Sequence, residues 1–186
     1  MYFGCPGRLR RLHVDAVLIR RETPDDIATI HAVTAAAFTD TGTNVEAPLV
    51  DELRADPGWL PALSLVATDN DGAIVGHVVA TRARVDEFPV LGLGPLSVHP
   101  SHQRRGVGSA LVHTLLGAAD ALDEPLVALL GNPAYYHRFG FRLSAEFGIR
   151  PPVAEWQPHF QVRTLTAYSP AIRGTFTYAA PFDRTM

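Results

Sequence analysis

The feature that most constrains this chain is a glycine-rich turn, residues 103–109, between an apolar strand and an amphipathic helix. Gly106 and Gly108 carry no Cβ, so a bulky anion can approach the backbone closely. The first amides of the helix have no intrahelical acceptor, and the helix dipole favours a negative group there by about 0.3–1 kcal/mol. Arginine adds charge and planar donors for phosphate. The turn predicts a pyrophosphate site formed by Gln103, Arg104, Arg105, Gly106, Val107, Gly108 and Ser109.

Other phosphate-binding turns do not fit this segment. A nucleotide-binding P-loop ends in Gly-Lys followed by Ser or Thr, and the turn has no such ending. A dinucleotide-binding turn needs a third glycine and belongs to the first strand–helix pair of its domain, whereas this turn lies mid-chain. A glycine pair at a helix start also occurs without any ligand, so the turn alone leaves that reading open.

Hydrophobic periodicity and turn residues predict the element order β-α-α-β-β-β-α-β-α-β-β. The helix between the strands at 90–98 and 125–130 implies a parallel crossover within a mixed sheet. Residues 69–72, Asp-Asn-Asp-Gly, are a hairpin signal, and Thr23-Pro24 is typical of a helix start. The predicted strands cover residues 14–20, 63–68, 74–84, 90–98, 125–130, 161–168 and 174–179, and the predicted helices cover 24–37, 46–55, 107–121 and 134–138.

The predicted strand at 90–98 contains Gly92, Gly94 and Pro95. Proline cannot donate to a ladder, and glycine within a strand marks a bulge or a close backbone approach. We therefore expect this strand to separate from its neighbour near Pro95. The separation would leave unpaired backbone donors and acceptors at Leu96, Ser97 and Val98.

Length and composition narrow the class of protein. A chain of 186 residues with 47% hydrophobic residues fits one domain, expected at 13–186 after an extension at 1–12. A net charge of −3 provides no basic field for nucleic acid. The single cysteine, Cys5, excludes an intrachain disulfide and a cysteine-based metal cage. With no apolar run long enough for a membrane span, a cytoplasmic location is expected.

Two stretches together resemble the GCN5-related N-acetyltransferase (GNAT) family, in particular a bacterial subgroup. Residues 96–111, LSVHPSHQRRGVGSAL, are similar to its central Q/R-x-x-G-x-G/A motif, which Gln103, Gly106 and Gly108 match. Residues 132–141, NPAYYHRFGF, resemble its second motif, in which a tyrosine precedes Gly-Phe by four residues. The resemblance implies a mixed, mostly antiparallel sheet of about seven strands, flanked by helices, with a splayed central pair.

The resemblance also implies a cofactor and its contacts. Acetyl-coenzyme A (acetyl-CoA) would place its pyrophosphate on residues 104–109 and its pantetheine arm along the backbone of Leu96 and Val98. The acetyl oxygen would accept a backbone amide near Val98. Asn132 would lie near the arm, although it is equally typical of a helix cap. No metal is expected.

Tyr136 holds the position of the family's tyrosine and would protonate the departing thiolate, since a phenol with a pKa of about 10 stays protonated at neutral pH. Tyr135 is expected to pack only. The group that takes the proton of the amine stays open among Glu46, Glu52, Glu87, His77 and His99. His99 and His102 are interpreted as surface histidines rather than zinc ligands.

The resemblance predicts direct transfer of acetyl from acetyl-CoA to an amine of a small molecule or peptide. The alternative is a non-catalytic acyl-CoA sensor or partner-binding module on the same fold. A homodimer stays open, and neither nucleic acid nor membrane is expected as a partner. The helices at 24–55 and the segment 150–173 would line the acceptor cleft with Phe38, Glu46, Asp51, Trp59, Trp156 and Phe160.

Overall fold

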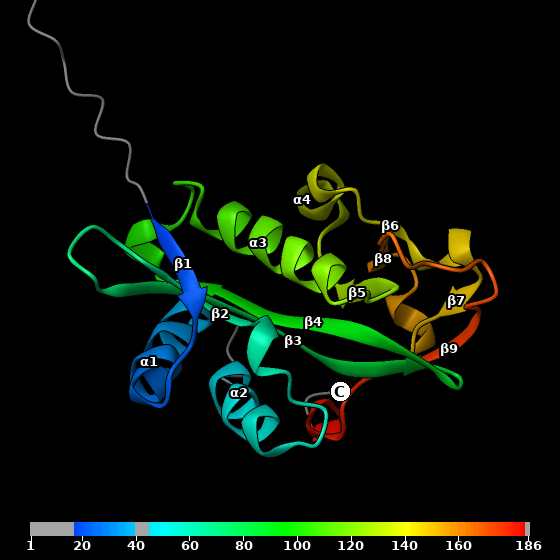
Figure 1. The fold of residues 1–186 in the computed structure, drawn as a ribbon, viewed down its shortest axis with the longest axis horizontal. Helices are drawn as coiled ribbons and strands as arrows, with labels where there is room; N and C mark the ends of the chain where they lie inside the picture. The colour runs from blue at the N-terminus through cyan, green and yellow to red at the C-terminus, as the bar shows by residue number, and fades with distance from the viewer. Residues whose placement is uncertain (1–16, 40–44, 185–186) are drawn as a thin grey trace, which may run out of the picture.

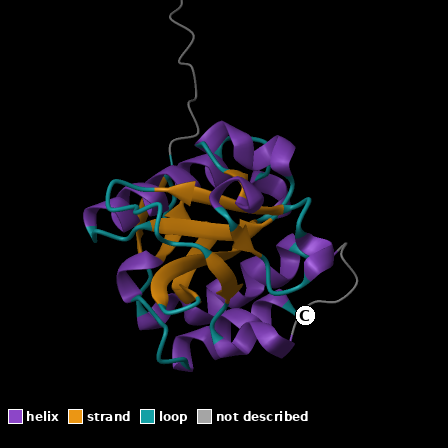
Figure 2. Ribbon diagram, turned by 90° about the vertical axis from the view of Figure 1, so that its right-hand side faces the viewer, coloured by secondary structure: helices purple, strands orange, loops and turns teal. Residues whose placement is uncertain are grey.

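The computed structural model describes residues 17–39 and 45–184. The expected extension at 1–12, Cys5, the domain start at residue 13 and the loop at 41–44 lie outside these residues. The first expected strand, at 14–20, is described from residue 17 onward. Within the described ranges the chain folds around one twisted sheet, which Figure 2 shows end-on between its helices.

The sheet has nine strands among the described residues, in the order β1-β2-β3-β4-β5-β8-β6, with β9 on the end of β3 and β7 on β9. Every pair on the main path is antiparallel except β4 and β5, which run parallel. The strands are β1 (Leu18–Arg21), β2 (Ser64–Thr68), β3 (Ile74–Val85), β4 (Phe88–Val98), β5 (Leu126–Leu130), β6 (Arg142–Leu143), β7 (Ile149–Arg150), β8 (Phe160–Thr164) and β9 (Gly174–Thr177).

Helices cover both faces of the sheet (Figure 1). The helices α1 (Ile27–Ala37) and α2 (Glu46–Ala55) lie on one face, and α3 (Val107–Ala121) and the one-turn α4 (Pro133–Tyr136) lie on the other. The helix α3 buries six residues, all of which belong to the main core together with residues of β2, β3, β4 and β5. The buried residues are Val107, Leu111, Val112, Leu115, Leu116 and Ala119.

The predicted fold class is confirmed: the sheet is mixed, mostly antiparallel and flanked by helices. All seven expected strands form, and so does the parallel crossover through α3. The hairpin at 69–72 closes as its residues require, because Gly72 has a φ of 82° and Asp69 accepts the amides of Asp71 and Ala73. The two additional strands, β6 and β7, are two residues each.

The strand β4 separates from β5, not from β3. It pairs with β5 only at Leu91 and Gly92, although both strands continue beyond that point. Against β3 it stays paired to Val98, with a register shift at the cis Gly94–Pro95 bond. The expected bulge is therefore present, but the opening begins at Gly92 and lies on one edge of β4.

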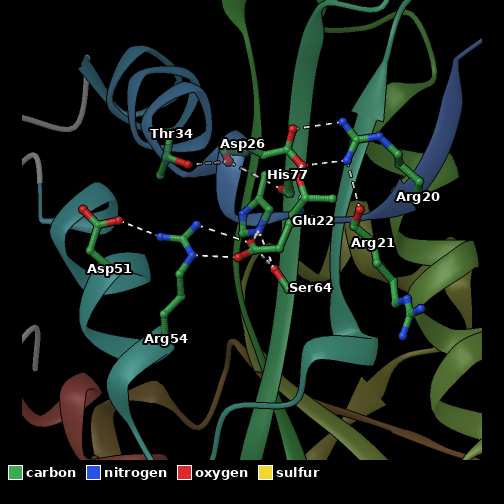
Figure 3. A network of polar contacts seen from close by, with 11 residues as sticks. Arg20, Arg21, Glu22, Asp26, Thr34, Asp51, Arg54, Ser64 and His77 are labelled. Carbon is green, nitrogen blue, oxygen red and sulfur yellow. Dashed lines mark hydrogen bonds and ion pairs between the residues drawn. The ribbon is translucent and has the colours of Figure 1, made fainter.

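A largely buried polar network ties α2 to the neighbouring strands β1, β2 and β3 (Figure 3). Glu22, just after β1, accepts hydrogen bonds from Arg54 Nε at 2.7 Å and Ser64 Oγ at 2.5 Å. His77 Nε2 lies 2.9 Å from Ser64 Oγ and 3.3 Å from the Glu22 carboxylate. Burial raises the pKa of Glu22, but the hydrogen bonds from His77, Arg54 and Ser64 outweigh burial and hold the pKa at about 2.

His77 in this network is neutral for a structural reason. Its side chain is fully buried, and its Nδ1 has no hydrogen-bond partner among the described residues. A second proton would place an N–H where nothing described accepts it. Burial accordingly lowers the pKa of His77 below its ordinary value, against the opposing pull of Glu22.

Candidate active site

The glycine-rich turn forms a left-handed corner followed directly by α3. Arg104 and Gly106 have φ angles of 59° and 90°, and α3 begins at Val107. The first amide with a helical acceptor is that of Ala110, which donates to Gly106 O at 2.9 Å. The amides of residues 107–109 precede that bond and are the donors that a helix start offers to an anion.

A cavity of about 280 Å³ opens beside this turn. Gly108 forms part of its floor, and a Cβ there would lie 2.8 Å from Tyr135 Oη. Arg104 also lines the cavity, whereas Arg105 donates to Ser101 O at 3.3 Å within the loop. Gln103 lines the cavity and also donates a hydrogen bond from its Nε2 to Val98 O, at 3.1 Å.

The backbone of β4 presents alternate residues to the opening. His99 N–H donates to Val75 O on β3, at 2.9 Å. Because backbone groups alternate sides along a strand, Ser97 also faces β3, while Leu96 and Val98 face away from it. Ser97 is 1% exposed, and its Oγ lies 3.0 Å from Thr34 Oγ1 on α1. Leu96, Ser97 and Val98 were expected to be unpaired. Ser97 instead pairs with β3 through its backbone and contacts Thr34 through its side chain.

A second cavity, of about 610 Å³, lies where β4 and β5 diverge. It shares Leu96 and Phe38 with the first cavity, so the two are neighbours along one wall. The described residues that line it are Phe38, Val45, Glu46, Leu49, Leu93, Gly94, Pro95, Leu96, Leu130, Gly131, Asn132, Tyr136, Trp156, Tyr178 and Phe182.

The two adjacent tyrosines of α4 serve different cavities. Tyr136 lines the cavity between β4 and β5, and Tyr135 lines the one beside Gly108. Their rings meet edge to face with centroids 4.9 Å apart. Burial, with a smaller contribution from Tyr135, raises the pKa of Tyr136 well above its ordinary value, so the phenol keeps its proton. Tyr135 also packs on Phe139, but its hydroxyl reaches the turn.

Comparison with known proteins identifies the family. A family model described as an acetyltransferase (GNAT) domain matches residues 18–144. The chain belongs to this family. The family, the enzyme class and the fold expected from the sequence are confirmed, and the matched residues of this acetyltransferase include the left-handed corner before α3.

Relatives of this GNAT acetyltransferase include proteins of several bacteria. The N-acetyltransferase YhbS of Escherichia coli (strain K12), itself termed uncharacterized, is 33% identical over 171 residues, which is 90% of this chain and 99% of YhbS. The crystal structure of E. coli YhbS in complex with CoA has a TM-score of 0.84 and 32% identity, covering 91% of this chain and 93% of that one. A GNAT family acetyltransferase from Brucella melitensis in complex with acetyl-CoA has a TM-score of 0.75 and 32% identity, covering 91% and 99%.

Asn132 in this acetyltransferase caps α4. Its Oδ1 accepts the amide of Ala134 at 2.9 Å, as its place before Pro133 suggests. The residue also borders the cavity between β4 and β5. Of the two alternatives open from the sequence, the cap is therefore present, and a contact with the cofactor stays a prediction.

The five candidate bases separate clearly. His77 is held in the buried network and lines neither of the two site cavities. His99 binds Ser101 Oγ at 2.7 Å, and Glu87 is exposed in the turn between β3 and β4. Glu52 is on α2 but is not among the residues that line either cavity. Glu46 is the one candidate among the described residues that borders the cavity with Tyr136.

Only some of the residues expected around the acceptor line this cavity. Phe38, Glu46 and Trp156 line the cavity as expected. Trp59 instead packs beside Leu49 and Leu53, and Phe160 is fully buried in the core. Asp51 forms a hydrogen bond with His31 Nδ1 at 2.7 Å and an ion pair with Arg54 at 2.6 Å.

Sequence reasoning missed Tyr178 and Phe182, which complete the cavity wall from the C-terminal segment. The ring of Tyr178 lies over Gly92, where a Cβ would approach to 2.8 Å. The only local signal was Gly92 itself, which indicates a close approach but not the residue that makes it.

His99 and His102 both contact the Ser101 hydroxyl, and the described part of the chain contains no group of three or more potential metal ligands. None of the helices in the described ranges is long and apolar enough to span a membrane.

Proposed function

We propose that this GNAT acetyltransferase uses acetyl-CoA to acetylate an amine, with the cofactor cradle at residues 103–109 and Tyr136 as the proton donor. The observation that carries the proposal is the meeting of two cavities at Leu96, one beside the helix start and one holding the protonated Tyr136. When bound, acetyl-CoA supplies an activated acetyl thioester. The solved complexes of E. coli YhbS with CoA and of the Brucella protein with acetyl-CoA support this donor.

The residues of the turn fit a pyrophosphate. The amides of Val107, Gly108 and Ser109 would bind its oxygens, and Arg104, which lines the same cavity, would add charge. Gln103 would hold the turn to β4 through its bond to Val98 O. We keep Arg105 and Gly106 as parts of the cradle, since the first braces the loop and the second provides its left-handed corner.

The open edge of β4 fits the pantetheine arm. The backbone groups of Leu96 and Val98 face away from β3. Val98 O already accepts Gln103 Nε2, so the groups available to pair with an extended amide chain are the N–H and C=O of Leu96 and the N–H of Val98. Leu96 borders both cavities, and Val98 borders the cofactor cavity. The amide of Leu96, rather than one near Val98, would therefore bind the acetyl oxygen beside Tyr136.

Tyr136 would give its proton to the leaving sulfur. The raised pKa keeps the phenol protonated, which suits a donor and not a base. The amine would attack the thioester carbon directly, without an enzyme nucleophile: the C–N bond forms, the C–S bond breaks, and the proton lost by the nitrogen passes through solvent and restores the phenol. Family membership and the N-acetyltransferase relatives support the enzyme over the non-catalytic module. The cytoplasmic location, the single domain at 13–186 and a homodimer stay predictions.

Thermal unfolding with ligands tests the donor. Acetyl-CoA at a hundredfold excess over its dissociation constant should stabilise the folded state by about 2.7 kcal/mol. For a domain of this size, that corresponds to a rise in melting temperature of roughly 5–10 °C. ATP should give much less, because it has no pantetheine arm for the edge of β4. An equal rise with ATP would contradict the proposal.

Two glycines of α3 provide matched variants for this test. Gly108→Ala places a methyl group in the cradle, so the stabilisation by acetyl-CoA should shrink. Gly117→Ala is the control, because its added Cβ would meet nothing within 4 Å. If Gly108→Ala keeps the full stabilisation, the cradle lies elsewhere.

A further inference from the structure

The cavity between β4 and β5 contains one charged side chain among the described residues that line it. That residue is Glu46, the first residue of α2. The other residues around it are apolar, aromatic, or carry neutral polar groups such as Asn132. A cavity with a single negative charge in an otherwise neutral wall selects a cation over an anion.

One oxygen of this carboxylate is unsatisfied. Glu46 Oε2 is buried and has no hydrogen-bond partner among the described residues. A buried charged acceptor without a donor is costly, so a native structure that keeps one calls for a physical explanation. The position at the start of α2 explains why an acid is favourable there, because the helix dipole attracts it. The helix start does not explain why Oε2 lacks a hydrogen-bond donor, because the N-cap residue of α2 makes no side-chain hydrogen bond.

Besides Tyr136, four aromatic side chains border the same cavity from separate parts of the chain: Phe38 after α1, Trp156, Tyr178 and Phe182. Aromatic faces attract cations and bury apolar groups. The carboxylate and the rings together therefore suit a molecule with a cationic end and an apolar body. A polyhydroxylated or multiply charged amine would leave polar groups unpaired against these walls.

We propose that Glu46 binds the ammonium group of the acceptor, and that the acceptor is a primary amine on an apolar or aromatic body without a neighbouring carboxylate. This assignment rests on the proposed function, in which the same cavity receives the amine opposite Tyr136. Glu46 acts through recognition: its carboxylate accepts a hydrogen bond from the ammonium. An amino acid with the same body brings a carboxylate close to Glu46 and is repelled.

The test measures binding to the protein with CoA bound, by titration calorimetry, with 2-phenylethylamine and phenylalanine as probes. The two share an aromatic body and an amine and differ in the carboxylate. We expect 2-phenylethylamine to bind and phenylalanine to bind at least about tenfold more weakly, because repulsion between its carboxylate and Glu46 offsets the hydrogen bond made by its ammonium.

Glu46→Gln removes the charge and keeps the shape of the side chain. The variant should bind 2-phenylethylamine about 10- to 100-fold more weakly than the parent does. The difference in affinity between 2-phenylethylamine and phenylalanine should become smaller. Glu87→Gln is the matched control, because Glu87 is exposed and lies outside this cavity. It should bind both probes as the parent does.

The proposal is overturned if Glu46→Gln binds 2-phenylethylamine as tightly as the parent, if phenylalanine binds equally well, or if neither probe binds at millimolar concentration. Stabilisation by acetyl-CoA is measured in the same samples. A normal rise in melting temperature with acetyl-CoA, together with any of these outcomes, rejects the acceptor class alone. Loss of that rise in the parent protein rejects the proposed function itself.

Discussion

Glu22 and Glu46 are two carboxylates with different surroundings in the same protein. Glu22 accepts hydrogen bonds from Arg54 and Ser64 and lies beside His77. Glu46 borders a cavity, and its Oε2 is buried without a hydrogen-bond partner among the described residues. A carboxylate surrounded by donors has its interactions within the fold, whereas one facing an empty volume can bind a donor from outside. The contrast separates the buried network, which holds the sheet to α2, from the cleft where chemistry is proposed.

The largest expected effect belongs to the cleft. Tyr136→Phe removes the proposed proton donor and little packing, so kcat should fall by about 10²–10⁴-fold. The dissociation constant of acetyl-CoA should change little, because the lost interaction strengthens only in the transition state. Steady-state kinetics with an amine acceptor and calorimetry with acetyl-CoA measure the two quantities.

Tyr135→Phe is the control for that experiment. Its hydroxyl lies beside Gly108 in the cofactor cavity, so the change should alter acetyl-CoA affinity more than kcat. Unchanged kcat in Tyr136→Phe, with the chemical step shown to limit the rate, would mean that another group or solvent protonates the thiolate.

The second largest effect belongs to the network. Glu22→Ala leaves Arg54 without its buried partner, which should cost about 3 kcal/mol, the lower end for breaking a buried ion pair. The melting temperature should fall by roughly 6–12 °C. Acetyl-CoA affinity at low temperature should be unchanged, because the network lines neither of the two site cavities. Glu46→Gln should shift the melting temperature by less than about 2 °C. Similar falls in melting temperature in Glu22→Ala and Glu46→Gln would mean that the two carboxylates do not differ in their contribution to stability.

The smallest effect is a pH dependence. The pKa of Glu22 is about 2 in the folded protein and 4.5 ordinarily, so its stabilisation is complete above pH 4.5 and is lost as pH falls toward 2. His77, whose pKa is lowered by burial, adds a loss that begins as pH falls below 6.5. The melting temperature of the parent should therefore fall in two stages.

Glu22→Gln isolates the second stage, because glutamine does not titrate. The difference in melting temperature between this variant and the parent should shrink as pH falls below 4.5. Differential scanning calorimetry from pH 7 to pH 3 measures it. A difference that stays constant over that range would mean that the Glu22 carboxylate is not stabilised by the fold.

Local signals in the sequence predicted most of the fold. The hairpin at 69–72, Thr23-Pro24 and the glycine turn each specify a conformation through residues adjacent in sequence, and each forms as expected. The strands β6 and β7 were not predicted, because a strand of two residues is too short to show a hydrophobic periodicity. The buried face of α3 includes Val112, Leu116 and Ala119, while Thr114 on the same helix is exposed. Helical periodicity alone does not decide which of these positions is buried, because that depends on how the helix packs against the sheet.

The site could be predicted only where it is local. Residues 103–109 carry their chemistry in their own turn, and Tyr136 follows from a short motif. His77 looked as available as Glu46, because its partner Glu22 is 55 residues away and nothing local pairs them. Tyr178 and Phe182 reach the cavity through the path of the C-terminal chain after β9. Long-range pairing decides which polar residue is satisfied and which one faces the cavity.

The shared wall of the two cavities has a consequence for inhibitor design. Phe38 and Leu96 border both, so one molecule can occupy both volumes across a short bridge. Once its coenzyme-like end is held at the turn, binding of its amine-like end becomes intramolecular, with an effective concentration in the millimolar range for a short flexible bridge. A bisubstrate compound that joins the two ends through a short thioether would gain avidity here, and shortening or lengthening the thioether would measure the gap between the sites.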